Sequence, residues 1–595
     1  MRLLGVALVL VLALTAGSSA AQQVRLRAEE SLRDVLNAAS LLRELRDDEE
    51  AKAQDFVAAA RADYRRLLTA LYSEGYYAGV ISITIDGREA SDIPPLGGPD
   101  RIESIVITVR QGPRFDFGTA VVQPLVPGTE LPDGFRRGEV AHSEVIEDAV
   151  GSARRAWRNA GHAKVRVADE SIVARHPERR LDAVVTLAPG PRLTFGPLLI
   201  TGNENVRTER IRTIAGLPVG EVYSPEEIDR ATARLRRTGA FDSVALTEAE
   251  VIGPGNTLPL ELTVVEAKPR RFGFGAEVSS VEGLTLTGFW LHRNLLGGAE
   301  RFRVDAEIDG IDDDIEGTDY AVRAAFNRPA TFGPDTDLYA RAEVSRQDEP
   351  DYLLDKASAE VGLIRRLTDD ITLEYGVGLL RAYEESDVGT RHYTLLTFPV
   401  AVEGDFRDDP ADAQRGWYLE FDADPFTDLE AELYGARFYV DGRGYYSFGT
   451  EDRFTFAART QVGSLWGVEY DEAPADFVFY SGGGGTVRGQ PYRSLGVDRV
   501  VDGDNVTTGG LSFAGVQLEA RVQVRPKIEA VGFYDVGHVG ETAMPLEQGE
   551  WHAGTGIGVR YLTGIGPIRL DLATPATGDN AYEQVQVYIG IGQAF

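Results

Sequence analysis

Cysteine is absent from the 595 residues, and histidine occurs only seven times. Without cysteine the chain can form neither disulfides nor thiolate metal sites. The histidines are scattered, with no pair at the spacing that places two ligands on one helix face. We interpret them as surface or packing residues, and we expect no cofactor and no bound metal.

The sequence also lacks an excess of positive charge. It has 93 acidic residues against 61 lysines and arginines, which gives a net charge of -32. Such a chain repels the phosphate backbone of a nucleic acid. We therefore expect no nucleic-acid partner.

Long apolar runs are missing beyond the N-terminus. There, Arg2 precedes an apolar run from Leu3 to Ala16 and then small residues, a pattern typical of a secretory signal peptide, residues 1–21. About 14 apolar residues are too few for a helix that crosses a bilayer, which needs roughly 20. An exported chain of this kind can enter a membrane only as a closed β-barrel.

The first half of the sequence contains an internal repeat. The segments Gly112–Gly118 and Gly190–Gly196 share the pattern Gly-Pro-Arg-x-x-Phe-Gly. Pro113, Pro191 and Pro269 follow one another at equal intervals of 78 residues. This spacing predicts three units of similar size in series.

Each unit is expected to contain one strand, two helices and two strands, in the order β-α-α-β-β. In the third unit, Ser224 and Pro225 are typical of a helix start, and Gly239 of its end; a strand from Phe241 to Leu246 follows. Small α+β domains of this kind leave sheet edges exposed. We expect these edges to bind extended polypeptides by strand addition, with a mere spacer role as the alternative.

The second half alternates between apolar and polar residues. Phe302 and Val304, for example, interleave with Arg303 and Asp305. A soluble β-sandwich is one solution, but a long sheet with one charged face favours a barrel with lipid outside and water within. From Arg271 onward the length predicts a transmembrane antiparallel β-barrel of about 16 strands.

Two other patterns resemble binding motifs only superficially. The aspartate runs Asp312–Asp314 and Asp408–Asp409 lack the spacing of a calcium loop and are interpreted as solvated turns. The glycines 482–485 lack the Lys-Ser/Thr ending of a phosphate-binding loop.

The most distinctive cation, Arg488, lies within a glycine-rich stretch. In the strand Val516–Val524 the apolar residues take even positions, which places Glu519 on the polar face. The same count in the strand from Ile528 places Phe533 and Asp535 inward. Both carboxylates are therefore predicted to face a loop folded into the lumen.

Several motifs resemble the BamA/TamA outer-membrane assembly superfamily. The tip of its inward-folded loop 6 is similar to Val487-Arg488-Gly489-Gln490, and its Phe-x-Asp-x-Gly strand to Phe533–Gly537. Further similarities are Asp405–Gly416, Thr563–Asp571 and the aromatic C-terminus Phe595. Three repeats, rather than the five usual in BamA, indicate the TamA branch. Gln490 replaces an aromatic residue of the family, and Gln593 a hydrophobic one.

The resemblance implies POTRA domains at residues 22–111, 112–190 and 191–268, followed by a barrel at residues 269–595. It implies a bacterial outer-membrane insertase, not an enzyme, with its POTRA domains in the periplasm. The expected partners are unfolded outer-membrane clients such as autotransporters, an inner-membrane-anchored TamB-like protein, and outer-membrane lipids.

The resemblance also implies a lateral seam between the first and last barrel strands. Glycines on or near these two strands would weaken the pairing between them, although barrel curvature alone could also require glycine there. The alternative function is a polypeptide-secretion or solute channel through the lumen. The expected site comprises loop 6 (Val487, Arg488, Gly489, Gln490), its lumen partners (Glu519, Phe533, Asp535, Gly537) and the seam (Gly273, Gly275, Gly590, Gly592, Phe595).

Overall fold

The computed structural model describes residues 23–46, 51–94, 99, 101–279, 283–311, 318–349, 352–386, 389–501, 504–564, 566–578 and 581–595. The expected signal peptide and the aspartates 312–314 lie outside these ranges. The chain divides into two units: Met1–Gly196 with Val219–Glu226 and Glu250–Leu258, and Pro197–Pro218 with Glu227–Ala249 and Pro259–Phe595. Within the described ranges, no helix is both long enough and apolar enough to cross a membrane.

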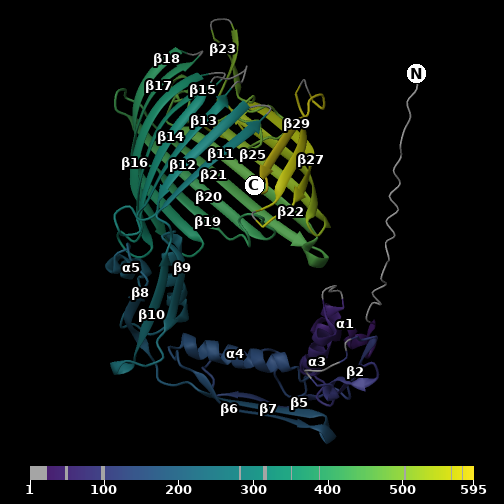
Figure 1. Cartoon of the computed structure of the whole chain (residues 1–595). Coiled ribbons are helices and arrows are strands. Elements are labelled where there is room, and N and C mark those ends of the chain that lie inside the picture. Colours follow the sequence, from purple (N-terminus) through teal and green to yellow (C-terminus); the bar gives the residue numbers. More distant parts are fainter. Residues whose placement is uncertain are drawn as a thin grey trace, which may run out of the picture. The chain divides into compact units, whose positions relative to one another are not determined.

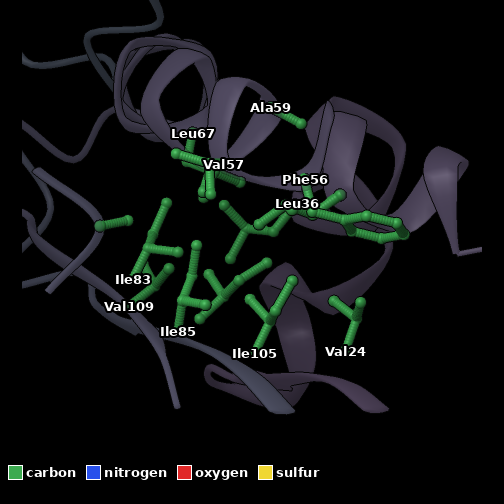
Figure 2. Packing of buried hydrophobic residues seen from close by; sticks show 14 of the residues in the cluster. Val24, Leu36, Phe56, Val57, Ala59, Leu67, Ile83, Ile85, Ile105 and Val109 are labelled. Carbon is green, nitrogen blue, oxygen red and sulfur yellow. The ribbon is translucent and has the colours of Figure 1, made fainter. Parts of the chain in front are cut away.

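The first repeat packs helices against a four-stranded sheet. Its apolar core lies between Leu36, Phe56 and Leu67 of the helices and Ile83 and Ile105 of the strands (Figure 2). The sheet order is β1-β4-β2-β3, with β1 parallel to β4. The elements are β1 (Gln23–Arg27), α1 (Arg33–Ala39), α2 (Leu41–Leu45), α3 (Ala53–Ser73), β2 (Val80–Ile85), β3 (Arg88–Glu89) and β4 (Ser104–Arg110).

The third repeat has the predicted β-α-α-β-β order and the sheet order β8-β10-β9. Its elements are β8 (Thr194–Thr201), α5 (Thr208–Ala215), α6 (Pro225–Arg237), β9 (Phe241–Glu248) and β10 (Thr257–Glu266).

The second repeat departs from the predicted order because it has a single helix. Its sheet order is β5-β7-β6, and its elements are β5 (Asp116–Gln123), α4 (Ser143–Asn159), β6 (Arg166–Arg175) and β7 (Arg180–Ala188). The segment before α4 forms turns instead of a helix. Pro127, Pro132 and Gly134 lie there, and proline and glycine disfavour helix interiors. The expectation of two helices in every unit is therefore wrong for this one; the first repeat has three.

The two Gly-Pro-Arg motifs, at residues 112–118 and 190–196, each form a hydrogen bond with a glycine that follows the preceding helix. Gly75 and Gly161 follow the ends of α3 and α4 with φ of 82° and 95°. Their carbonyl oxygens accept hydrogen bonds from the N–H groups of Phe115 and Leu193, each 2.9 Å long. Both side chains are fully buried. The first of the two 78-residue intervals therefore separates Phe115 and Leu193, which make the same backbone contact.

The C-terminal half is one antiparallel sheet that curves into a barrel, with β23 at one end (Figure 1). In the described residues the sheet has 17 strands, which follow the chain order from β11 to β22 and then from β25 to β29. A separate hairpin, β23 (Val497–Val501) and β24 (Asp504–Thr508), belongs to the connection between β22 and β25. The strands β18 and β19 both pair with β17 and with β20, so they are consecutive parts of one crossing, interrupted at Phe398–Pro399.

The barrel strands are β11 (Arg270–Ser279), β12 (Gly283–His292), β13 (Arg301–Ile311), β14 (Asp319–Arg328), β15 (Thr336–Glu349), β16 (Tyr352–Arg366), β17 (Ile371–Ser386), β18 (Gly389–Thr397), β19 (Val400–Asp405), β20 (Gly416–Asp428), β21 (Tyr434–Phe448), β22 (Phe454–Trp466), β25 (Ser512–Arg525), β26 (Ile528–Gly540), β27 (Gly549–Tyr561), β28 (Ile568–Pro575) and β29 (Gln586–Ile591). Within the described residues, no backbone pairing joins β11 to β29.

The two faces of the barrel wall differ as the alternation predicts. On β25, Leu518 is 49% exposed, whereas its neighbour Glu519 is buried. On β26, Tyr534 is 46% exposed, whereas Phe533 and Asp535 are buried. The charged side chains therefore face inward together with Phe533, whereas Leu518 and Tyr534 face outward.

Candidate functional site

The connection between β22 and β25 folds back into the barrel, and two glycines allow its path. Gly482 has φ of 106°, and a Cβ there would lie 2.2 Å from the carbonyl oxygen of Pro491. Gly489 has φ of 95°, and a Cβ there would lie 2.5 Å from the backbone of Thr574. No other residue type fits these positions without backbone movement.

At the tip of this loop, Arg488 binds both predicted carboxylates. Its Nε and Nη2 donate to the two Asp535 oxygens at 2.7 and 2.9 Å, and its Nη1 donates to Glu519 Oε1 at 2.6 Å. Its backbone N–H also donates to Asp535, at 3.1 Å. The guanidinium lies 3.7 Å from the ring centroid of Phe533. The structure thus brings together four residues that the sequence predicts to meet.

Three further charged residues complete a buried cluster. Arg521 Nε donates to Glu519 Oε2 at 2.9 Å, Arg560 pairs with Asp571, and Asp571 Oδ2 lies 3.5 Å from Arg488 Nη1. The three arginines and three carboxylates balance in charge, and all six are almost fully buried. Paired charges in such a dry setting depend on each other, because removing one leaves its partner uncompensated.

Sequence reasoning missed the roles of Arg521 and Arg560. The signal for Arg521 was available, because it lies two residues from Glu519 and so on the same face of β25. The partner of Arg560 depends on how β27 pairs with β28, which periodicity along one strand does not reveal.

The remaining motif residues pack the loop tip against the wall. Gly537 makes room for Val487, because a Cβ there would lie 2.8 Å from a methyl of that side chain. Gln490 donates to the carbonyl oxygens of Ala553 and Thr577 at 3.2 and 3.3 Å. In place of aromatic stacking, this glutamine therefore provides hydrogen bonds.

The loop tip also reaches the last strand of the sheet. The backbone N–H of Gly489 donates to the hydroxyl of Tyr588, at 3.1 Å. Tyr588 belongs to β29, which is only six residues long. Loop 6 and the end strand are thus in direct contact.

A second anchor, not predicted from the sequence, lies further along the loop. Arg493 Nη1 donates to Glu349 Oε1 at 2.5 Å and to the hydroxyl of Tyr352 at 3.0 Å. Its guanidinium also lies 4.1 Å from the ring centroid of Tyr480. These partners are distant in sequence and show no local pattern, so only the folded loop brings them together.

The predicted seam glycines lie on or beside the two end strands of the sheet. Gly273 and Gly275 on β11 make room for Phe289 and Thr287 of β12. Gly590 on β29 makes room for Arg569, and Gly592 follows the strand with φ of 99°. Packing against the neighbouring strand is therefore one physical reason for three of these glycines.

Phe595 does not lie at the seam, contrary to the prediction. It is buried against Ala413, Tyr445 and Ala457, on the inner side of the wall. Gln593 accepts from Arg560 Nε at 3.1 Å and donates to Asp412 at 2.8 Å. The polar Gln593 thus anchors a tail that turns inward after β29.

The cluster is suited to holding a loop. Each of its carboxylates is engaged by arginine, so the charges on the loop and on the wall hold each other in place. In the part of the chain that the structure describes, no group of three or more His, Asp or Glu residues could hold a metal ion.

Comparison with known proteins agrees with this architecture. Residues 294–595, just over half of the chain, match the model of the Omp85 superfamily domain, and residues 193–267 match the surface antigen variable number repeat, or POTRA. The chain is 21% identical over 522 residues to outer membrane protein assembly factor BamA of Neorickettsia risticii, covering 82% of this chain and 68% of that one. It is 22% identical to BamA of Neisseria meningitidis serogroup B, covering 70% and 55%.

Among solved structures, BamA from Haemophilus ducreyi lacking POTRA domains 1–3 matches with a TM-score of 0.61 at 13% identity. The match covers 80% of this chain and 98% of that structure, so it supports the fold. The chain thus spans about two thirds of one curated relative and just over half of the other. It belongs to the Omp85 superfamily, as an outer-membrane β-barrel preceded by periplasmic POTRA domains.

Proposed function

We propose that this protein is an assembly factor that inserts unfolded outer-membrane proteins into the membrane through a lateral seam between β11 and β29. The observation that carries the proposal is the contact between loop 6 and the end strand. Arg488 fixes the loop to β25 and β26, and Gly489 binds Tyr588 of β29. A short, incompletely paired end strand is suited to pairing with an incoming strand.

The POTRA repeats provide a reason for clients to bind before insertion. In the second repeat β6 is an edge strand, and Ile172 and Val173 are 42% and 48% exposed on it. An edge with exposed apolar side chains can accept an extended polypeptide by backbone hydrogen bonding. Autotransporters are the clients we propose, as in the TamA branch, with a TamB-like protein anchored in the inner membrane as partner.

The absence of cysteine allows a direct test of the seam. Phe274→Cys on β11 and Ile589→Cys on β29 introduce thiols at positions that are 89% and 70% exposed. Oxidative cross-linking of this pair is expected to block assembly of an autotransporter client in proteoliposomes, and reduction should restore it.

The matched control is a cysteine pair across a closed part of the wall. Val361 and Val377 face each other on β16 and β17, and both are outward-facing. Cross-linking them should leave assembly unchanged. Undiminished assembly by the oxidised β11–β29 pair would contradict the lateral-seam mechanism.

A channel through the lumen is the second candidate, because the inner face of the wall is polar. It predicts a large steady conductance in planar bilayers and no effect of the seam cross-link on transport. The buried anchors of loop 6 favour the assembly function, since the loop occupies part of the lumen.

A further inference from the structure

The second unit contains a cavity of about 270 Å³ at the end where the chain enters the barrel. Its walls come from the C-terminal ends of α5 and α6, from β13, β14, β15 and β16, and from the turn before β15. Six arginines line it, against one acidic residue, Asp337. The arginines are Arg234, Arg237, Arg301, Arg303, Arg341 and Arg366. Three of them pair with carboxylates outside the lining, Arg234 with Asp335, Arg303 with Asp305 and Arg341 with Glu374. Among the described residues, the excess of positive charge therefore comes from Arg237, Arg301 and Arg366 against Asp337.

One of these arginines has a structural role. Arg234 donates to both oxygens of Asp335 at 2.8 and 2.7 Å, and to the carbonyl oxygen of Ala215 at the end of α5. It therefore joins α6 to the end of α5 and to the turn before β15. Its donors are directed at protein partners and leave little for a ligand.

Other arginines of the cavity keep donors for a ligand. Among the residues that the structure describes, the one acidic group within 4 Å of Arg237 is Asp335, at 3.9 Å, and that carboxylate is already bound by Arg234. Burial, and to a smaller extent the nearby Arg366 guanidinium, lower the pKa of Arg237. Within the described part of the chain, no carboxylate lies within ion-pair distance of Arg301. Arg366 reaches Asp337 at 3.2 Å through a single nitrogen.

The shape of the cavity favours an extended ligand over a small enclosed ion. The side chains of Arg237, Arg303 and Arg341 are 37%, 36% and 47% exposed, so the cavity is open. Its lining also includes the apolar residues Ile214 and Ile364. Guanidinium groups bind carboxylates well, and the apolar wall suits the neighbouring side chains of a polypeptide.

We propose that this arginine cavity binds acidic side chains of an unfolded client polypeptide as it reaches the barrel entrance. The inference rests on the proposed assembly function, because only then does a polypeptide pass this point. Arg237 and Arg301 are the residues assigned to carboxylate binding. The site would hold clients by charge, which complements backbone pairing at the repeats.

The test uses the full-length protein in detergent and a fluorescent peptide of about ten residues, the length of one membrane strand. The peptide alternates glutamate with leucine or threonine, and a second peptide carries glutamine at each glutamate position. Fluorescence anisotropy at about 0.15 M salt measures binding. We expect the glutamate peptide to bind, and the variant Arg237→Gln/Arg301→Gln to bind it roughly tenfold more weakly.

A control variant separates the cavity from total charge. Arg136→Gln/Arg415→Gln removes the same charge from exposed positions outside the cavity and outside the β6 edge, which are 67% and 60% exposed. It should bind the peptide like the wild type, and circular dichroism should show that both variants are folded. Equal binding of the two peptides, or equal losses in the two variants, would overturn the proposal.

The remaining alternative is that the cavity binds small anions, and inorganic phosphate tests it. If millimolar phosphate displaces the glutamate peptide completely at constant ionic strength, the cavity is a small-anion site and the polypeptide assignment is wrong. Peptide binding is measured without any assembly reaction. If the seam cross-link fails to block assembly, the proposed function is contradicted, but the result of the peptide-binding experiment does not change.

Discussion

Replacing Arg488 with alanine removes a cation whose side chain is only 1% exposed and which binds two fully buried carboxylates. Glu519 keeps a second partner, Arg521, at 2.9 Å. Asp535 keeps only the backbone N–H of residue 488, because its other bonds in the cluster come from the lost guanidinium. The substitution therefore leaves one uncompensated buried carboxylate.

The expected loss of unfolding free energy is about 3 to 5 kcal/mol, the range for breaking a buried ion pair from one side. An exposed pair would lose no more than about 1 kcal/mol. The burial of all three side chains favours the larger figure. The loop should also become mobile, with faster protease cleavage near Gly485, and client assembly should fall.

The double variant Arg488→Ala/Asp535→Asn provides the decisive comparison. Its neutral amide removes the uncompensated charge, so it should be more stable than Arg488→Ala alone. Urea unfolding in detergent and limited proteolysis measure both variants, and Arg415→Ala at an exposed pair serves as control. Unchanged cleavage and unfolding of Arg488→Ala would refute the reasoning and reduce the motif to a turn.

Two further predictions concern other parts of the second unit. Gly489→Ala places a Cβ against the backbone of Thr574 and should cost about 1 to 3 kcal/mol in unfolding experiments, whereas Gly485→Ala, with open space around it, should be neutral. Hydrogen bonding to Arg234 lowers the pKa of Asp335, so its contribution to stability is complete above the unfolded pKa of about 3.9 and is lost as the pH falls through the lower folded value. Thermal unfolding between about pH 5 and pH 2 should show this loss, and Asp335→Asn should remove that part of the pH dependence; an unchanged pH profile would contradict the assignment.

Several features of the fold follow from short-range patterns. The alternation on β25 and β26 places Glu519, Phe533 and Asp535 inward, and the structure agrees. Gly239, which the sequence predicts to end a helix, follows α6 with φ of 66°. These predictions succeed because side-chain direction in a strand and left-handed backbone at a helix end depend on neighbouring residues alone.

Other features could not be predicted in this way. The second repeat has no helix before α4, although the repeat pattern predicts one, because the prolines and glycines of that segment disfavour a helix. Arg493 binds Glu349 and Tyr352, which lie on a hairpin more than a hundred residues away in sequence. Phe595 turns inside the barrel, because Gln593 binds Arg560 and Asp412 there.

The sequence by itself thus determined which half of this protein forms repeats, which half forms a barrel, and which charged side chains face the lumen. Only the tertiary structure decided which of those charges meet, because that depends on strand register and on the path of a long loop. Arg488 was evident as a lone cation in a glycine run. Its place in a neutral cluster with Arg521, Arg560 and three carboxylates is set by strands that are far apart in sequence and adjacent only once the barrel has formed.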